Sequence, residues 1–249
     1  MLTAEELERY ERQIIIGGFG EKGQEKLKRA KVFIAGAGGL GSPVSIYLVA
    51  AGVGVMRIVD NDRVELSNLN RQVLHWDEDV GKRKIDSALA KLKRLNHGVK
   101  IETLEETITE TNVSRLVAGF DLIVDAMDNL PTRYLLNKAA LDQNIPFFHG
   151  AVYGFEGRAM TIIPGKTACL RCVYRGDTTK AKFPVVGVAP AVIGCIQATE
   201  VIKYIVGIGK LLANRLLVYD GLNMEFREFK VNQDPNCEHC GHLASKEGK

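Results

Sequence analysis

Charged and amide side chains crowd one short segment, residues 60–72, which reads DNDRVELSNLNRQ. The segment follows the apolar run VMRIV, which predicts a buried strand. At the strand end, Asp60 could accept hydrogen bonds from both hydroxyls of a ribose. Arg71 is suited to spreading charge over a polyphosphate. A sheet does not require so dense a polar run, so the segment indicates a polar ligand.

A glycine motif precedes this segment. Residues 36–41 read GAGGLG and lie between a predicted strand and a predicted helix. Glycines in the pattern G-x-G-x-x-G let the backbone turn tightly and approach phosphates, whose charge the helix N-terminus stabilises. Asp60 follows at about the 20-residue spacing expected of a ribose-binding acid. A tightly packed turn without a ligand is the alternative, but the strand–loop–helix context favours a nucleotide site.

Two further charges are predicted at the same edge of the sheet. Lys84 opens a predicted helix, where a cation opposes the helix dipole, and Asp128 follows the strand in DAMDN. The carboxyl ends of parallel strands lie along one edge, so these residues converge with the glycine loop. Asp128 could hold Mg²⁺. Singly, Lys84 could be a solvated residue, Arg71 a salt-bridge partner, and Asp128 with Asn129 a helix cap. Together they favour ATP over a nicotinamide dinucleotide.

Four of the five cysteines form two C-x-x-C pairs, Cys169 with Cys172 and Cys237 with Cys240. Four thiolates are enough for a tetrahedral, structural Zn²⁺, and this spacing lets each pair form a knuckle. A redox dithiol is the alternative, but it would not require a second pair. We expect Cys195 to pack as a small hydrophobic residue and His239 to take no part in metal binding.

Strands and helices alternate to about residue 150, as is typical of a parallel sheet with helices on both faces. Ser42 is the predicted N-cap of the helix after the glycine motif, with Pro43 at its first position. A threonine is expected to cap the helix predicted within residues 108–120. Helices are predicted at residues 4–13, 42–52, 81–96, 108–120 and 131–144, and strands at 31–35, 55–60, 99–106, 121–129 and 145–152.

The rhythm then changes to antiparallel strands at residues 157–165, 215–221 and 224–231, with a long apolar helix at 189–207 that we expect to be buried. The predicted fold is therefore α/β: a Rossmann-like, mostly parallel sheet with helices on both faces, continued by antiparallel strands and a four-cysteine zinc knuckle. We expect a single domain over residues 1–249, with a nucleotide-binding half at 1–150 and a second half at 151–249.

The bulk composition is that of a soluble globular protein, with 249 residues, 46% of them hydrophobic and 25% charged. A net charge of +3 is too small to argue for nucleic acid. The charged N-terminus lacks a signal-peptide core, and the most apolar stretch, residues 46–56, is too short to span a bilayer. We therefore expect a cytoplasmic protein without membrane contact.

These motifs in this order, RYERQ, GAGGLGS, DNDRVELSNLNRQ, VGKRK, DAMDN and the two cysteine pairs, resemble the ubiquitin-activating (E1-like) adenylyltransferase family. The resemblance covers almost the whole chain. It is strongest to the members that activate sulfur-carrier proteins in molybdopterin and thiamin biosynthesis, the MoeB/ThiF/HesA type. It implies an adenylyltransferase that uses ATP and Mg²⁺, carries structural Zn²⁺, and acts as a homodimer on a small ubiquitin-fold carrier ending in Gly-Gly.

The resemblance also assigns roles. Asp60 would hold the ribose, Asp128 the magnesium ion at the α-phosphate, and Arg12 would reach into the partner's site across a dimer interface. Arg12 on a solvated helix is the alternative. The expected catalytic residues are Asp128, Arg71, Lys84 and Arg12. The expected nucleotide-binding residues are Gly36, Gly38, Gly39, Gly41, Asp60, Asp62, Ser67, Asn68, Leu69, Asn70, Arg71, Lys84, Asp128 and Asn129.

In the implied reaction, the carrier's C-terminal carboxylate attacks the α-phosphorus of ATP, giving an acyl-adenylate and pyrophosphate. That carboxylate is ionised at pH 7, so no general base is needed, and we expect His75, His97 and His149 to be structural. Relatives often carry a further cysteine in the loop after the first cysteine pair. Residues 175–190 contain none, which favours release of the acyl-adenylate to an external sulfur donor.

The carrier's Gly-Gly tail could be guided by Phe155, Phe183 and Val185, although these residues could equally belong to the core. A tRNA-thiolation carrier or a small-molecule acid is a possible substrate on the same scaffold. Two other function classes remain open at this point. They are an NAD-dependent oxidoreductase, favoured by the glycine loop and Asp60 alone, and a non-catalytic nucleotide-binding scaffold.

Overall fold

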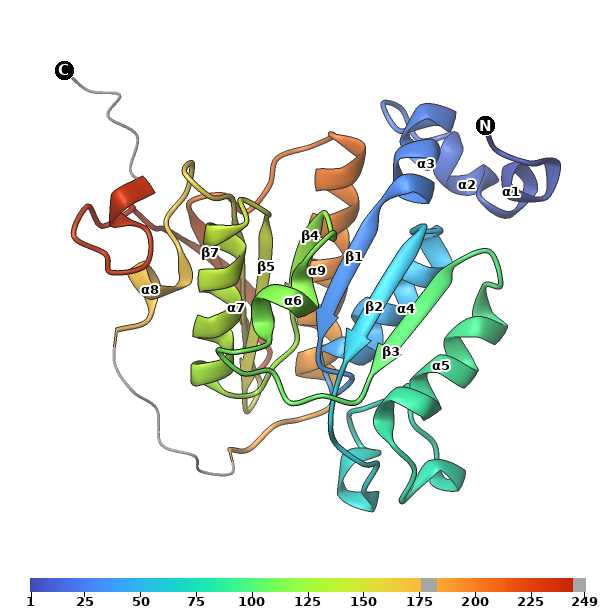
Figure 1. Ribbon diagram of the computed structural model, residues 1–249, viewed down its shortest axis with the longest axis horizontal. Helices are drawn as coiled ribbons and strands as arrows, with labels where there is room; N and C mark the ends of the chain where they lie inside the picture. The colour runs from blue at the N-terminus through green and yellow to red at the C-terminus, as the bar shows by residue number, and fades with distance from the viewer. Residues whose placement is uncertain (176–182, 244–249) are drawn as a thin grey trace.

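One eight-stranded sheet, in the order β3-β2-β1-β4-β5-β6-β7-β8, organises the computed structural model, which describes residues 1–175 and 183–243 (Figure 1). Neighbours from β3 to β5 pair in parallel, and those from β5 to β8 pair antiparallel. The predicted α/β fold class is therefore confirmed. The strands are β1 Lys31–Ala35, β2 Val55–Val59, β3 Lys100–Leu104, β4 Leu122–Asp125, β5 Phe147–Tyr153, β6 Glu156–Ile162, β7 Arg215–Asp220 and β8 Glu225–Lys230.

Helices cover both faces of the parallel part (Figure 1). One face packs on α3, α4, α5 and α9, and the other on α6, α7 and α8. The helices are α1 Ala4–Arg9, α2 Glu11–Ile14, α3 Gly20–Arg29, α4 Gly41–Ala51, α5 Lys84–Leu95, α6 Val113–Val117, α7 Leu130–Asp142, α8 Leu170–Val173 and α9 Val188–Val206, with 3-10 turns η1 Leu66–Asn68, η2 Asp77–Asp79 and η3 Gly241–Leu243.

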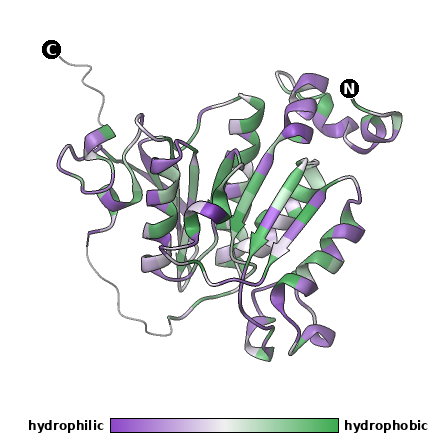
Figure 2. Cartoon of the chain, in the orientation of Figure 1, coloured by the Kyte–Doolittle hydropathy of each residue, from purple (hydrophilic) through white to green (hydrophobic). Residues whose placement is uncertain are grey.

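The central strand β1 shows why the sheet takes helices on both sides. Its alternate residues point to opposite faces: Val32 and Ile34 belong to the core under α4 and α9, while Phe33 and Ala35 belong to the core under α7. All four are fully buried. The strands at the centre of the sheet are accordingly largely hydrophobic (Figure 2).

The start of α4 corrects a prediction. The helix begins at Gly41 with Leu40 as N-cap, so Ser42 lies inside it and the predicted Ser42 cap is wrong. The hydroxyl and the backbone N–H of Ser42 both donate to the carbonyl of Gly38, at 2.8 and 2.9 Å. The glycine loop therefore runs directly into the first helical turn, and Pro43 is the third residue of the helix.

Two other helices also depart from expectation. The predicted threonine cap on α6 is wrong, because the helix begins only after Asn112, without a side-chain cap. Helix α9 is long and apolar enough to cross a membrane by composition, but it packs on α3, α4, β5 and β6. It is only partly buried, since Val192, Cys195 and Ile196 keep intermediate exposure. Helix α3 was not predicted.

Candidate functional site

The glycine loop lies between two acidic turns at the carboxyl edge of the sheet. In the strand register, Ala35 at the end of β1 stands opposite Val59 of β2 and Asp125 of β4. The segments that follow these three strands hold the glycine motif, Asp60 and Asp128. These three segments therefore lie at the same edge of the sheet, as the sequence predicted.

Two glycines in the loop cannot carry a side chain without rearrangement. Gly36 has a φ of +102°, and a Cβ there would lie 2.7 Å from the carbonyl oxygen of Ala126. A Cβ on Gly41 would lie 2.0 Å from the carbonyl oxygen of Gly36. The loop thus closes on itself and on the end of β4, and both contacts involve backbone that has no freedom to move aside.

The backbone N–H and the carbonyl of Ala37 both form hydrogen bonds with side chains outside the loop. Its N–H donates to Asp60 Oδ2 at 2.8 Å, and its carbonyl lies 2.9 Å from His75 Nε2. Burial lowers the pKa of His75, so the imidazole is neutral near pH 7. Its Nε2–H donates to the carbonyl of Ala37, and its Nδ1 lies 2.9 Å from Ser87 Oγ. His75 therefore supports the glycine loop, which agrees with the structural role predicted for it from the sequence.

We expect Gly41→Ala to affect mainly the stability of the loop and Gly38→Ala to affect mainly nucleotide binding. A Cβ on Gly38 meets Gln72 only at 3.6 Å, an ordinary contact. Gly41→Ala should therefore lower the melting temperature of the ligand-free protein, by an amount corresponding to about 2 kcal/mol or more. Gly38→Ala should leave it nearly unchanged but weaken nucleotide binding about tenfold, because the added methyl occupies the side on which a phosphate would approach. Thermal unfolding and calorimetric titration measure the two effects, and equal melting temperatures would contradict this account of the loop.

Lys84 has a specific reason to stand at the start of α5. Its side chain is 7% exposed, and its Nζ lies 2.8 Å from Asp62 Oδ2 in the segment after β2. Asp62 in turn donates its backbone N–H to Asp60 Oδ1 at 2.8 Å. Among the described residues this buried ammonium has one partner, the exposed carboxylate of Asp62, so two of its N–H donors are available to an anionic ligand.

Arg71 is held by neutral oxygens. Its Nη1 donates to the carbonyl of Ser67 at 2.7 Å and to Asn70 Oδ1 at 3.1 Å. It forms no salt bridge with any acid in the described residues, so its charge is available to a ligand. It also lies beside the glycine loop, because a Cβ on Gly39 would stand 3.7 Å from Arg71 Cγ.

The sequence left open whether Asp128 and Asn129 cap a helix or bind a ligand, and the structure assigns the cap to Asn129 alone. Asn129 is the N-cap of α7, with its side chain accepting the N–H of Thr132 at 3.0 Å. Asp128 is exposed, and its recorded contact is with the side-chain amide of Asn129 at 3.3 Å. The helix therefore does not need the carboxylate of Asp128, which lies at the carboxyl edge of β4.

The remaining predicted residues differ in burial and in position. Asn68 is buried, and its side-chain oxygen accepts the N–H of Glu65 at 3.1 Å, so it shapes η1. Leu69 is half-buried, while Ser67 and Asn70 are exposed. Arg12 is exposed on α2, at the opposite end of β1 from the glycine loop (Figure 1). Within one chain, the structure does not bring Arg12 to the other site residues.

An apolar groove of about 520 Å³ begins at Asn70, beside the predicted phosphate-binding residues. Two glycines that the sequence analysis did not single out contribute to its wall. Gly154 bridges to Val185, and a Cβ on Gly187 would lie 2.1 Å from the carbonyl oxygen of Asn70. The groove is lined by Asn70, Gly154, Phe155, Pro184, Val185, Val186 and Gly187.

The four paired cysteines form one cluster, with all Sγ atoms within 4.8 Å of one another. Adjacent sulfurs are 3.9 Å apart for Cys169 and Cys172, 3.6 Å for Cys169 and Cys237, and 3.5 Å for Cys172 and Cys240. A tetrahedral ion with metal–sulfur bonds of about 2.3 Å would place them about 3.8 Å apart. The cluster therefore fits a single metal ion with no open position.

The other two residues near this chemistry lie outside the cluster. The Nδ1 of His239 lies 3.0 Å from the side-chain amide of Asn137 on α7, so its ring is used in packing the second knuckle. Cys195 is half-buried on α9, and burial raises the pKa of its thiol. Of the cysteine-free loop that was predicted to favour release of the acyl-adenylate, residues 176–182 lie outside the described residues.

The comparisons with known proteins agree with this architecture. A family model described as the ThiF family matches residues 10–239. The chain is 45% identical over 246 residues to the SAMP-activating enzyme E1 of Haloferax volcanii, covering 96% of this chain and 91% of that protein. It is also 45% identical over 250 residues to the sulfur carrier protein adenylyltransferase of Thermus thermophilus, covering 96% and 92%. A crystal structure of MccB from E. coli with ATP superposes with a TM-score of 0.82 at 28% identity, covering 89% of this chain and 69% of that one.

Proposed function

Because the chain belongs to the ThiF family, we propose that it is an ATP-dependent adenylyltransferase that activates the C-terminal carboxylate of a small ubiquitin-like sulfur-carrier protein. The observation that carries this proposal is the polar edge of the sheet. There Arg71 lies against the glycine loop, Lys84 pairs with Asp62, and Asp128 follows β4, while Asn70 lines an apolar groove. An oxidoreductase would instead need an apolar nicotinamide site at this edge.

The chemistry of these residues matches the reaction. A carboxylate that attacks a polyphosphate brings two anions together, so the barrier is largely electrostatic. Arg71 and the partly shielded ammonium of Lys84 would neutralise charge on the phosphates. Asp60, beside the loop, would hold the ribose. Asp128 would hold Mg²⁺, which supplies further neutralisation at the α-phosphate. The products are the carrier's acyl-adenylate and pyrophosphate.

The groove supports a carrier with a Gly-Gly ending. Its lining includes Gly154 and Gly187, which have no side chains, and Gly187 packs against the carbonyl of Asn70. A tail without side chains would fit along this lining and bring its terminal carboxylate towards Asn70. Phe155 and Val185, which also line the groove, would contact the tail. The process proposed for the carrier is molybdopterin or thiamin biosynthesis, in the cytoplasm, with an external sulfur donor completing the transfer.

Zn²⁺ is the metal proposed for the cysteine cluster, because four thiolates at these spacings favour it and leave no position for a substrate. It would have a structural role, joining the segment after β8 to α8. A homodimer is proposed from the position of Arg12. Since Arg12 lies at the far end of β1 from its own site, it could contribute to phosphate binding only in a partner's site.

We expect ATP–pyrophosphate exchange to depend on the carrier's last two residues. Small ubiquitin-fold proteins ending in Gly-Gly, tested as a panel, should support exchange at least about tenfold above background. The same proteins truncated by two residues should not, because no carboxylate then reaches the α-phosphorus. Radiolabelled pyrophosphate incorporation into ATP measures this. Nicotinamide binding without exchange for any carrier would instead select the oxidoreductase.

A further inference from the structure

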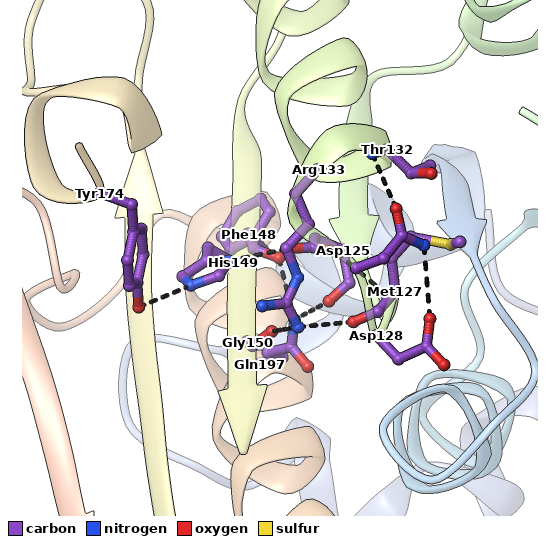
Figure 3. A network of polar contacts seen from close by, with 11 residues as sticks. Asp125, Met127, Asp128, Thr132, Arg133, Phe148, His149, Gly150, Tyr174 and Gln197 are labelled. Atoms are coloured by element: carbon purple, nitrogen blue, oxygen red, sulfur yellow. Dashed lines mark hydrogen bonds and ion pairs between the residues drawn. The ribbon is translucent and has the colours of Figure 1, made fainter. Parts of the chain in front are cut away.

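A cluster of buried polar side chains lies beneath the turn that carries Asp128 (Figure 3). Asp125, fully buried at the end of β4, accepts the N–H of Met127 through Oδ1 at 3.1 Å. Its Oδ2 lies 2.7 Å from His149 Nδ1 and 3.4 Å from Arg133 Nε. A carboxylate buried to this extent needs such partners to remain ionised.

Arg133 extends past Asp125 to the backbone. Its Nη2 donates to the carbonyl of Met127 at 2.5 Å and to that of Gly150 at 3.0 Å (Figure 3). The Met127 carbonyl belongs to the peptide unit that joins Met127 to Asp128. Asp125 thus holds the N–H of Met127 and Arg133 holds its C=O, so the backbone directly before Asp128 is fixed on both sides.

Helix stability does not explain this arginine. Arg133 lies in the first turn of α7, where a cation opposes the helix dipole, and its side chain is only 12% exposed. The guanidinium makes its two carbonyl contacts and its ion pair with one planar group, which a single ammonium cannot reproduce. Its contacts converge on the end of β4, the turn after it and the middle of β5.

His149 completes the cluster without adding charge. Burial lowers the pKa of His149, so the imidazole is neutral near pH 7. Its Nδ1–H donates to Asp125, and Nε2 accepts the hydroxyl of Tyr174 at 3.2 Å. The charges of Asp125 and Arg133 therefore balance within the cluster, and the two residues can act as one rigid support.

We propose that Arg133 is a positioning residue for the adenylation reaction, acting by fixing the Met127–Asp128 peptide so that the carboxylate of Asp128 faces the magnesium ion. This inference rests on the proposed function, in which Asp128 holds that ion. The side chain of Asp128 has one recorded contact, the amide of Asn129 at 3.3 Å. The backbone sets the direction of the Cα–Cβ bond from which this carboxylate projects, and that backbone is held by Arg133 and Asp125.

The test is a double-mutant cycle between Arg133→Lys and Asp128→Ala. Arg133→Lys keeps a positive charge beside Asp125 but loses the planar fork. We expect it to lower the kcat of carrier-dependent exchange by about 10- to 100-fold, since small misplacements of a reacting group cost this much. The Mg²⁺ concentration for half-maximal rate should rise several-fold, by about 5, while the KM for ATP stays within about threefold. In the Asp128→Ala background, Arg133→Lys should cost less than about threefold more.

Two further variants keep the test decisive. Arg115→Lys on α6 is the matched control, because this exposed arginine pairs with Glu106 away from the site. If Arg133→Lys fails to fold, the pair Asp125→Asn with Arg133→Met removes both charges together and still leaves an acceptor for Met127 N–H. We expect this pair to show the same kinetic losses.

The outcomes distinguish the two proposals. Absence of carrier-dependent exchange in the wild-type protein would remove the proposed function. Wild-type exchange with an unchanged kcat and Mg²⁺ requirement in Arg133→Lys would overturn the positioning role alone. Equal losses from Arg133→Lys with and without Asp128 would also overturn it, because they would show that Arg133 acts independently of that carboxylate.

Discussion

Replacement of Asp128 by alanine should lower carrier-dependent ATP–pyrophosphate exchange by about 100-fold or more, without loss of the fold. The carboxylate is exposed and is not the cap of α7, since Asn129 fills that role. Its removal therefore leaves the helix intact, while the site loses its proposed ligand for Mg²⁺. The exchange rate at saturating ATP, followed as a function of Mg²⁺, measures the effect.

Asp142→Ala provides a matched control for Asp128→Ala. Asp142 ends the same helix and pairs with Lys138 at 2.7 Å, so its loss removes a carboxylate from α7 far from the site. Exchange should stay within about twofold of wild type, because exposed ion pairs contribute little. If Asp128→Ala retained wild-type exchange, the proposed magnesium position at the end of β4 would be wrong.

Loss of one cluster cysteine should have the largest effect on stability. We expect Cys237→Ala to abolish stoichiometric zinc binding and lower the free energy of unfolding by about 4 kcal/mol or more. The cluster joins the first knuckle, at α8, to the second knuckle after β8, and its loss frees the segment that follows the sheet. Zinc content by elemental analysis and unfolding by denaturant give the two readouts.

Cys195→Ala is the control within the same residue type. Both Cys195 and Cys237 are half-buried, but Cys195 lies on α9 outside the cluster. Its replacement should change the free energy of unfolding by no more than about 1 kcal/mol and leave the zinc content intact. Equal destabilisation by the two substitutions would mean that the cluster has no metal-dependent role in folding.

Much of the fold could be predicted from local patterns. The apolar runs of β1, β2 and β4 are short and rich in β-branched residues, and the glycine motif marks the turn after β1. Helix caps were less predictable. Ser42 has the right residue type for a cap, but the glycine loop makes the hydrogen bonds of the first turn itself. Helix α3 was missed because it contains two glycines and its apolar face is narrow.

The supports of the site could not be predicted from the sequence. Asp125 and His149 are 24 residues apart and meet only because β4 and β5 pair in register. In the sequence Arg133 is an ordinary helical arginine, and only the fold brings the carbonyl of Gly150 beside it. By contrast, Asp60 and Lys84 carried clear signals, because an acid at a strand end and a cation at a helix start both need an explanation. Residue types in a sequence thus identify the residues that could contact a ligand more readily than the residues that position them.

Strand β5 has a consequence for any attempt to divide this chain. It spans Phe147–Tyr153, so the expected boundary between the two halves, at residue 150, falls inside it. The strand pairs in parallel with β4 on one side and antiparallel with β6 on the other. Fragments separated there would each carry half a strand and an uncovered apolar surface. We therefore regard the two halves as inseparable, so split-reporter fusions or circular permutants should be opened elsewhere, for example at the β7–β8 hairpin.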